Sequence, residues 1–307
     1  MGAALCLLSA AAFGVMAMFA KLAYRDGVDV NTLLFVRFGV AALVLRSIAV
    51  ARGSLRRLDR RAVLAGLGMG ALGYAAQSTL YFEALERVDA SQVALVFSSY
   101  PLLVMITAVL AGRERASRRR ALALALAWVG IALVLTGGSA AAFDLGGASL
   151  ALSAAAVYTG YILVGDHVAR GLPPVDLAAL VCSGAAATFL ASALVRGGPH
   201  LGFQTAGWVW LVLLSLLCTV AAILLFFAGI TRVGPTVTAL LGTLEPVVTV
   251  VSAAVVFHEQ LSLAQAFGGA AVLAAVLVVQ WPARQHEAAS APAQHPVLMV
   301  PEPAPVG

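Results

Sequence analysis

Long apolar stretches separated by short polar ones make up most of this chain. Crossing the roughly 30 Å hydrocarbon core of a bilayer takes a helix of about 20 apolar residues. Alanine and leucine dominate the stretches, and apolar residues do not alternate with polar ones, which favours helices over strands. The pattern predicts an all-α integral membrane protein of ten transmembrane helices, at 3–23, 31–50, 62–84, 90–111, 121–137, 148–166, 176–196, 207–230, 235–256 and 263–281.

The composition agrees with this fold class and narrows the functions. The chain is 62% hydrophobic and 11% charged, whereas soluble proteins carry about 25% charged residues. Its three cysteines, Cys6, Cys182 and Cys218, lie in apolar segments without metal-ligand or disulfide spacing. The net charge of +5 comes without a basic stripe interleaved with aromatic residues. We therefore expect no metal, no cofactor, no catalytic residues and no nucleic-acid partner.

Lysine and arginine positions predict the orientation. With the N-terminus in the cytoplasm, fourteen arginines face the cytoplasm and four basic residues, Lys21, Arg25, Arg87 and Arg196, face outward, while Arg37 lies within a helix. Such an excess is the usual mark of cytoplasmic loops. Both termini are thus expected in the cytoplasm. Residues 282–307 hold six of the twelve prolines and predict a disordered cytoplasmic tail.

The chain contains an internal repeat. Residues 80–117 align without a gap on residues 225–262, and Phe82, Pro101 and Glu114 match residues 145 positions later. This predicts two five-helix halves, 1–140 and 141–281. Because five is odd, the second half should cross the membrane in the opposite sense. The loop RERASRRR and its counterpart HEQLSLAQ agree, since the first has five arginines and the second none. Inverted repeats are typical of secondary transporters.

Several motifs carry a resemblance to a known family. They are the run of Phe13, Gly14 and Lys21, the LLFVRFGVAALVL pattern containing Arg37, and the repeated hairpin through Pro101 and Glu114 and then LEP and Glu259. Over about residues 3–281 the chain resembles the drug/metabolite transporter superfamily, specifically its EamA-type ten-helix members. The resemblance implies a multi-pass carrier of a bacterial inner membrane, typically an exporter of amino acids or other small metabolites. It also implies a cavity formed mainly by helices 1, 3, 4, 6, 8 and 9.

Glu245, in the stretch LLGTLEPVVTVV, is the main candidate for chemistry. An acidic residue at a helix centre costs roughly 2.5–3.5 kcal/mol on insertion scales, so it usually faces a cavity or the bundle interior. We predict that Glu245 couples transport to protons or binds an amine. Alternatively, it lies near the cytoplasmic mouth, paired with Arg232 or a hydroxyl. Its counterpart is Tyr100, and Pro101 and Pro246 should bend their helices.

Aromatic and amide side chains supply the other candidate substrate ligands. Tyr74, Gln77 and Tyr81 share one helix face by their spacing, and Tyr158 and Tyr161 lie three residues apart on another helix. Together with Tyr100 and Glu245 they predict a pocket for an amphipathic organic solute. The alternative is that these groups only pack helices together.

Three further charged residues have simpler interpretations. Arg37 either reaches the interface, pairs with Asp26 or Asp29, or meets a substrate carboxylate, and a structural role is favoured. Lys21 should extend to the membrane surface. Glu259 lies beside His258, which suggests a proton site, but a solvated helix end is favoured.

These features predict a secondary-active exporter of small organic metabolites, working by alternating access. Its partners are the substrate and the lipid bilayer, and a homodimer is left open. The alternative is a membrane-embedded enzyme or flippase acting on lipid-linked substrates, which would need acidic residues and histidines clustered at one interface. A channel fits two antiparallel halves less well than a carrier does.

Overall fold

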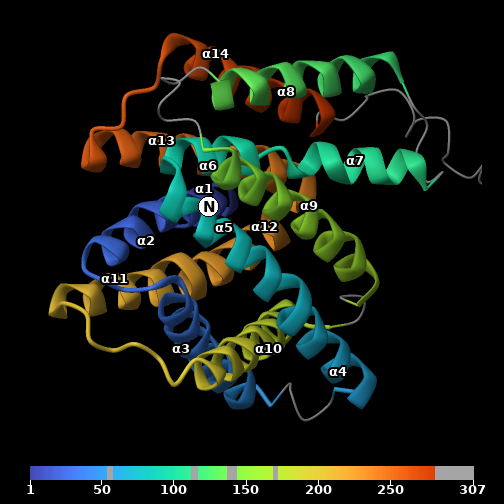
Figure 1. The fold of residues 1–307 in the computed structure, drawn as a ribbon. Coiled ribbons are helices and arrows are strands. Elements are labelled where there is room, and N and C mark those ends of the chain that lie inside the picture. Colours follow the sequence, from blue (N-terminus) through green and yellow to red (C-terminus); the bar gives the residue numbers. More distant parts are fainter. Residues whose placement is uncertain (54–57, 112–116, 137–143, 169–171, 281–307) are drawn as a thin grey trace, which may run out of the picture.

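The computed structural model describes residues 1–53, 58–111, 117–136, 144–168 and 172–280. Every regular element in these ranges is a helix (Figure 1). The predicted tail at 282–307 and residues 113–116 of the arginine-rich loop lie outside them. The elements are α1 (Gly2–Gly14), α2 (Met16–Arg25), α3 (Val30–Ala51), α4 (Arg60–Gly68), η2 (Met69–Tyr74), α5 (Ala75–Arg87), α6 (Ala90–Phe97), α7 (Tyr100–Leu110), α8 (Arg118–Thr136), α9 (Leu145–Val168), α10 (Pro174–Val195), α11 (Thr205–Ser215), η4 (Leu216–Ala221), α12 (Ala222–Gly242), α13 (Leu244–Phe257) and α14 (Leu263–Gln280).

Most of these helices are apolar enough to lie in a membrane. Six stretches of the described chain are also long enough to cross it: Gly2–Arg25, Val30–Ala51, Ala90–Leu110, Leu145–Gly165, Pro174–Val195 and Thr205–Gly234. Three shorter apolar helices follow the same pattern, at Ala121–Thr136, Leu244–Phe257 and Leu263–Val279. The predicted segment 62–84 falls in the helical run α4–η2–α5, which belongs to neither group. The chain is therefore a multi-pass membrane protein.

Contacts between helices show which way each one runs. Helices α1 and α12 run in opposite directions. The Ser9 hydroxyl of α1 donates to the carbonyl of Ala222, the first residue of α12, at 2.8 Å, whereas Gly2 at the start of α1 lies against Arg232 in the middle of α12. Helix α13 runs alongside α1 and α2 in the same direction: Thr249 donates to the Gly14 carbonyl at 2.8 Å, and the Arg25 guanidinium lies 4.5 Å from the centre of the Phe257 ring. We call the end of the molecule where α1 begins the Met1 end, and the opposite end, where α2 ends, the Asp26 end.

The two halves pack on each other in a reciprocal way. Helix α1 of the first half packs on α12, and its counterpart α9 packs on α5. Helix α3 packs on its own counterpart α10, and α8 packs on its counterpart α14. In Figure 1 the α8–α14 pair forms an outer layer over α6, α7 and α13, whereas α3 and α10 lie together at the opposite side. Exchanging the halves thus reproduces the main contacts.

Each half also contains a π-helix at nearly the same place. Helix η2 interrupts the run from α4 to α5, and η4 interrupts the run from α11 to α12, 147 residues later. Single π-turns are rare and occur frequently at functional sites. In η4 the widened turn lets the Thr219 hydroxyl donate to the carbonyl of Leu214, five residues earlier. The same hydroxyl accepts a hydrogen bond from Nε of the buried Arg37 at 2.9 Å.

Glycines allow α10 to approach α4 and η2 backbone to backbone. A Cβ atom added at Gly70 would lie 2.0 Å from the Val181 carbonyl oxygen, and one added at Gly184 would lie 2.1 Å from the Leu67 carbonyl oxygen. Both distances are far inside van der Waals contact. Small residues at such contacts are the usual means of close helix packing in membranes.

Pro101 and Pro246 each stand in the first turn of a helix, just after a break. Helix α6 ends at Phe97 and α7 begins at Tyr100, so Pro101 needs no backbone N–H partner there. Helix α12 ends at Gly242 and α13 begins at Leu244. The two breaks place Tyr100 and Glu245, the residues before these prolines, at matched points of the two halves.

Candidate functional site

A cavity of about 390 Å³ lies between the two halves, on the Met1 side of the molecule. Its walls come from the first half of α10, the second half of α9 and both ends of α12, together with α1, η2, the breaks before α7 and α13, and part of α14. Both halves of the chain therefore contribute. The lining includes Cys6, Ser9, Phe13, Tyr74, Phe97, Ser98, Tyr100, Pro101, Tyr158, Tyr161, Val181, Cys182, Phe226, Phe227, Thr238, Glu245 and Pro246.

Four tyrosines form a continuous aromatic wall of this cavity. The ring centres of Tyr74 and Tyr161 are 5.4 Å apart, and Tyr161 is stacked on Tyr158 at 5.7 Å. Tyr158 in turn meets Tyr100 edge-on at 4.9 Å. Phe97 closes the group, at 5.4 Å from Tyr158 and 5.6 Å from Tyr100. These spacings are typical of favourable aromatic pairs, so the wall presents fixed ring faces to a bound molecule.

Glu245 is the charged residue of the cavity lining. It lies in the first turn of α13, where the dipole of the helix favours a negative charge. The alternative partner expected from the sequence, Arg232, instead donates to the carbonyl of Ala228 in its own helix. Within the described part of the chain, the ion pairs are those of Lys21 with Asp89 and with Glu259, so Glu245 faces the cavity without a basic partner.

Hydroxyl and thiol groups line the part of the cavity nearer the Met1 end. Ser9 and Cys6 come from α1, and Thr238 comes from α12. The Cys6 sulfur lies 3.5 Å from the Thr238 hydroxyl oxygen. The remaining lining is mainly apolar, as expected of a pocket for an organic molecule.

Two of the residues expected at the site do not line the cavity. Gln77 is 7% exposed and accepts a hydrogen bond from the Ser78 hydroxyl. Tyr81 is 5% exposed and packs on Phe97, with ring centres 5.1 Å apart. Both share a helix face with Tyr74, but seven residues of helix are about 10 Å long. Residues on one face of a helix can therefore lie at different depths in the membrane. Gln77 and Tyr81 lie nearer the Asp26 end than Tyr74, and Phe97 packs between Tyr81 and the cavity.

Arg37 has the structural role that the sequence favoured. It is 2% exposed, it donates to Thr219, and its guanidinium lies over the rings of Phe38 and Phe82 at 4.9 and 5.2 Å. Asp29, one of its expected partners, instead caps α3 by accepting from the Thr32 backbone N–H at 3.0 Å. Arg37 therefore joins α3 to η4 rather than reaching the cavity.

Sequence reasoning missed the environment of Glu259 and Lys21. Glu259 was expected at a solvated helix end, but its side chain is only 8% exposed and accepts hydrogen bonds from the start of α6. Lys21 was expected to extend to the membrane surface, but its ammonium forms ion pairs with Glu259 and Asp89. A signal was present in the repeat, because both halves carry a glutamate at this position, Glu114 and Glu259.

Two paired helical halves around an amphipathic cavity are the architecture of a membrane transporter. A family model for the EamA-like transporter family matches residues 1–136 and again residues 145–281, and the chain belongs to this family. The two matches also show the two repeats.

Similar proteins carry transporter names. "Uncharacterized transporter YcbK" of Bacillus subtilis is 25% identical over 276 residues, which cover 87% of this chain and 88% of that protein. An "Uncharacterized transporter" of Archaeoglobus fulgidus is also 25% identical, over 280 residues, covering 90% of this chain and 95% of that protein. A protein crystal structure superposes with a TM-score of 0.65 at 21% identity, covering 91% of this chain and 96% of that one, which supports the fold alone.

Proposed function

We propose that this protein is a secondary-active exporter of small organic metabolites in a bacterial inner membrane. In this proposal ten helices cross the membrane, the halves lie in opposite orientations, and both termini are cytoplasmic. The halves move relative to each other so that the cavity faces the two sides alternately. The observation that carries the proposal is the cavity itself, which lies between the two repeats and combines apolar walls with one carboxylate.

The substrate that this cavity fits best carries a protonated amine on an apolar or aromatic body. Ring faces attract cations electrostatically, and Glu245 supplies a negative charge beside four tyrosines. The described lining contains neither lysine nor arginine. Amines and amino acids share the ammonium group.

Glu245 also serves as the proton-coupling residue in this proposal. When substrate leaves, a proton takes its place on the carboxylate, so that an isolated charge need not cross the membrane interior. Substrate and proton then compete for one site, which gives exchange in opposite directions. Transport of an amine should therefore be driven by a proton gradient.

The test is transport by the full-length protein in proteoliposomes. A pH gradient should drive uptake of a labelled aromatic amine or amino acid, and preloaded substrate should stimulate counterflow. Glu245→Gln should reduce proton-driven uptake at least roughly tenfold, which corresponds to the loss of one charge-assisted contact. Glu83→Gln is a matched control, because Glu83 is an acidic residue of α5 outside the cavity lining.

Three outcomes would contradict parts of this proposal. Normal transport by Glu245→Gln between pH 5 and 8 would remove the coupling role. Equal uptake of neutral analogues would remove the preference for amines. Chemical conversion of a lipid-linked substrate without counterflow would favour an enzyme or flippase.

A further inference from the structure

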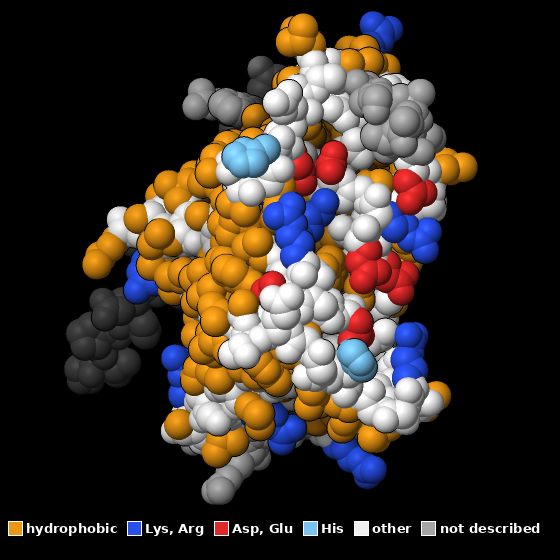
Figure 2. All heavy atoms as spheres, turned by 60° about the vertical axis from the view of Figure 1, so that its left-hand side comes forward, with side chains coloured by type: hydrophobic (Ala, Val, Ile, Leu, Met, Phe, Trp, Pro, Cys, Tyr) orange, Lys and Arg blue, Asp and Glu red, His pale blue; other side chains and the backbone are white. Residues whose placement is uncertain are grey.

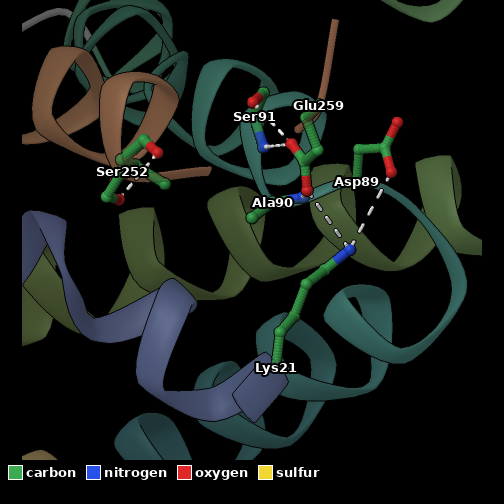
Figure 3. Close-up of polar contacts among 7 residues, drawn as sticks. Lys21, Asp89, Ala90, Ser91, Ser252 and Glu259 are labelled. Atoms are coloured by element: carbon green, nitrogen blue, oxygen red, sulfur yellow. Dashed lines mark hydrogen bonds and ion pairs between the residues drawn. The ribbon is translucent and has the colours of Figure 1, made fainter. Parts of the chain in front are cut away.

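Glu259 joins the two repeats at the Asp26 end. It follows α13 directly, after His258 turns the chain in the left-handed region with φ 57° and ψ 30°. Its carboxylate accepts from the backbone N–H groups of Ala90 and Ser91 at 3.1 and 3.2 Å, and from the Ser91 hydroxyl at 2.7 Å. Figure 3 shows this carboxylate pointing at the first residues of α6, with Lys21 approaching from below. A residue of the second repeat thus caps a helix of the first.

Lys21 adds a third element to this junction. Its ammonium lies 3.6 Å from the Glu259 carboxylate and 3.9 Å from that of Asp89. The glutamate–lysine contact is largely removed from water, since the two side chains are 8% and 19% exposed. Asp89 is 58% exposed and contributes less, because exposed ion pairs are weak. The ends of α2, α6 and α13 are therefore held together mainly by Glu259.

This junction lies at the end of the molecule opposite the cavity. Other contacts tie the same end: Trp210 donates to the Asp26 carboxylate at 2.7 Å, and the His200 N–H donates to the Thr32 hydroxyl at 3.1 Å. Beneath them the packing is tight, with side chains 0–1% exposed at Ala20, Ala23, Leu85, Ala90, Val93 and Ala253. Figure 2 shows charged side chains gathered in a band on one face between apolar flanks. The structure is therefore closed at the Asp26 end.

The other half of the repeat lacks one donor of this device. Position 90 matches position 235, where the residue is Pro235, and proline has no backbone N–H to donate. A glutamate at the matched position, Glu114, would lose one of the two N–H donors that Glu259 has. The sequence thus offers fewer donors at this position in the other half, although the repeat is present twice.

We propose that Glu259 and Lys21 form a latch that holds the Asp26 end shut while the cavity faces the Met1 side. The latch rests on the proposed transport function, because it matters only if the cavity opens alternately to each side. For the opposite state to form, the Glu259 carboxylate must leave the N-terminus of α6. Weakening the latch should then shift the population toward that state without changing the cavity.

The test measures from which side the cavity can be reached. Ser98 lines the cavity and is small, so Ser98→Cys, in a chain whose three native cysteines are replaced by alanine, reports on it. A membrane-impermeant maleimide is applied to intact cells and to inside-out vesicles. Without further changes, labelling should occur from the cytoplasmic side. Glu259→Gln should raise labelling from the outer side roughly tenfold, the effect of one lost hydrogen bond to a charged group.

Two more variants keep the test decisive. Lys21→Met leaves the helix cap in place and should raise outer labelling less than Glu259→Gln does. If the Glu259 variant folds poorly, Lys21→Met still tests the latch. Asp89→Asn removes a neighbouring charge without touching the cap and should leave labelling unchanged. Unchanged outer labelling in both Glu259→Gln and Lys21→Met overturns the latch. Failure of Ser98→Cys to react from either side instead counts against a water-accessible cavity, and hence against the proposed function.

Discussion

The pKa of Asp89 is set by its burial and by the neighbouring charges of the latch, Glu259 and Lys21. Burial raises the pKa of its carboxyl, Glu259 raises that pKa further, and Lys21 lowers it. The ionised form is thus less favourable in the folded protein than in the unfolded chain. Above the folded pKa this costs stability, and the cost disappears as the pH falls and both states become protonated.

Asp89→Asn should therefore raise the thermal stability of the purified protein slightly at neutral pH. The advantage over the unsubstituted protein should shrink as the pH is lowered through the range where Asp89 takes up its proton. Melting in detergent at several pH values measures this. A variant less stable than the parent at pH 7 would mean that the contact with Lys21 outweighs burial and repulsion.

Side-chain identity at the cavity was largely predictable, whereas side-chain depth was not. Glu245 stood out because a carboxylate is costly in an apolar helix, and Tyr158 and Tyr161 because polar aromatics avoid lipid. Tyr81 and Gln77 were expected in the cavity from their spacing to Tyr74, but neither lines it, and Tyr81 packs on Phe97 instead. Helical periodicity gives the direction of a side chain, and only packing against other helices sets where a cavity ends.

At the scale of elements, the contact of α10 with the end of α4 and with η2 depends on the absence of a side chain. Gly184 faces the carbonyl of Leu67 and the backbone nitrogen of Ala71, at 2.1 and 2.9 Å from where a Cβ would be. Backbone atoms cannot turn aside as a flexible side chain can. The two helices would have to separate to admit even a methyl group.

Gly184→Ala should accordingly destabilise the protein by about 1–3 kcal/mol, the usual cost of overpacking. Gly160→Ala is the control, because Gly160 of α9 has open space where its Cβ would be and alanine favours helix there. Yield in the membrane and melting temperature in detergent compare the two. Equal stability of the variants would show that η2 and α10 separate at little cost.

Helix boundaries followed from the sequence better than helix interiors did. The breaks at 25–30 and 196–205 coincide with Gly, Asp and Pro residues, which mark turns. The π-helices were not foreseen, because a widened turn changes no hydrophobic pattern over six residues. The cap of α6 by Glu259 was not foreseen either, because its two backbone donors lie 169 and 168 residues before Glu259 in the chain.

For the whole molecule, the proposed inversion of the two repeats has a direct test. Ser117 and Ser262 occupy matched positions, 145 residues apart, near the starts of α8 and α14. Helices α8 and α14 run antiparallel: Gln265 donates to the Val134 carbonyl at 3.4 Å near one end of the pair, and Arg119 donates to the Val278 carbonyl near the other. Residues at equivalent helix starts should therefore emerge on opposite sides.

Cysteines introduced singly at positions 117 and 262 should react with an impermeant reagent from opposite faces of the membrane. Position 117 is expected on the cytoplasmic side, where arginines gather. Inside-out and right-side-out vesicles distinguish the two faces. Labelling of both positions from one face would overturn the inversion, and with it the proposed alternating movement of two equivalent halves.

The paired π-helices bear on the origin of the chain. An extra residue in a helical turn is an uncommon insertion, yet it occurs in both halves within two residues of the same register. Two separate acquisitions at one place are a poor explanation compared with a single one. The wide turn points to an ancestral five-helix unit that already possessed it before the gene was copied and fused, after which its descendants took different tasks: one now supports Tyr74 beside the cavity, the other supports Arg37 in the core.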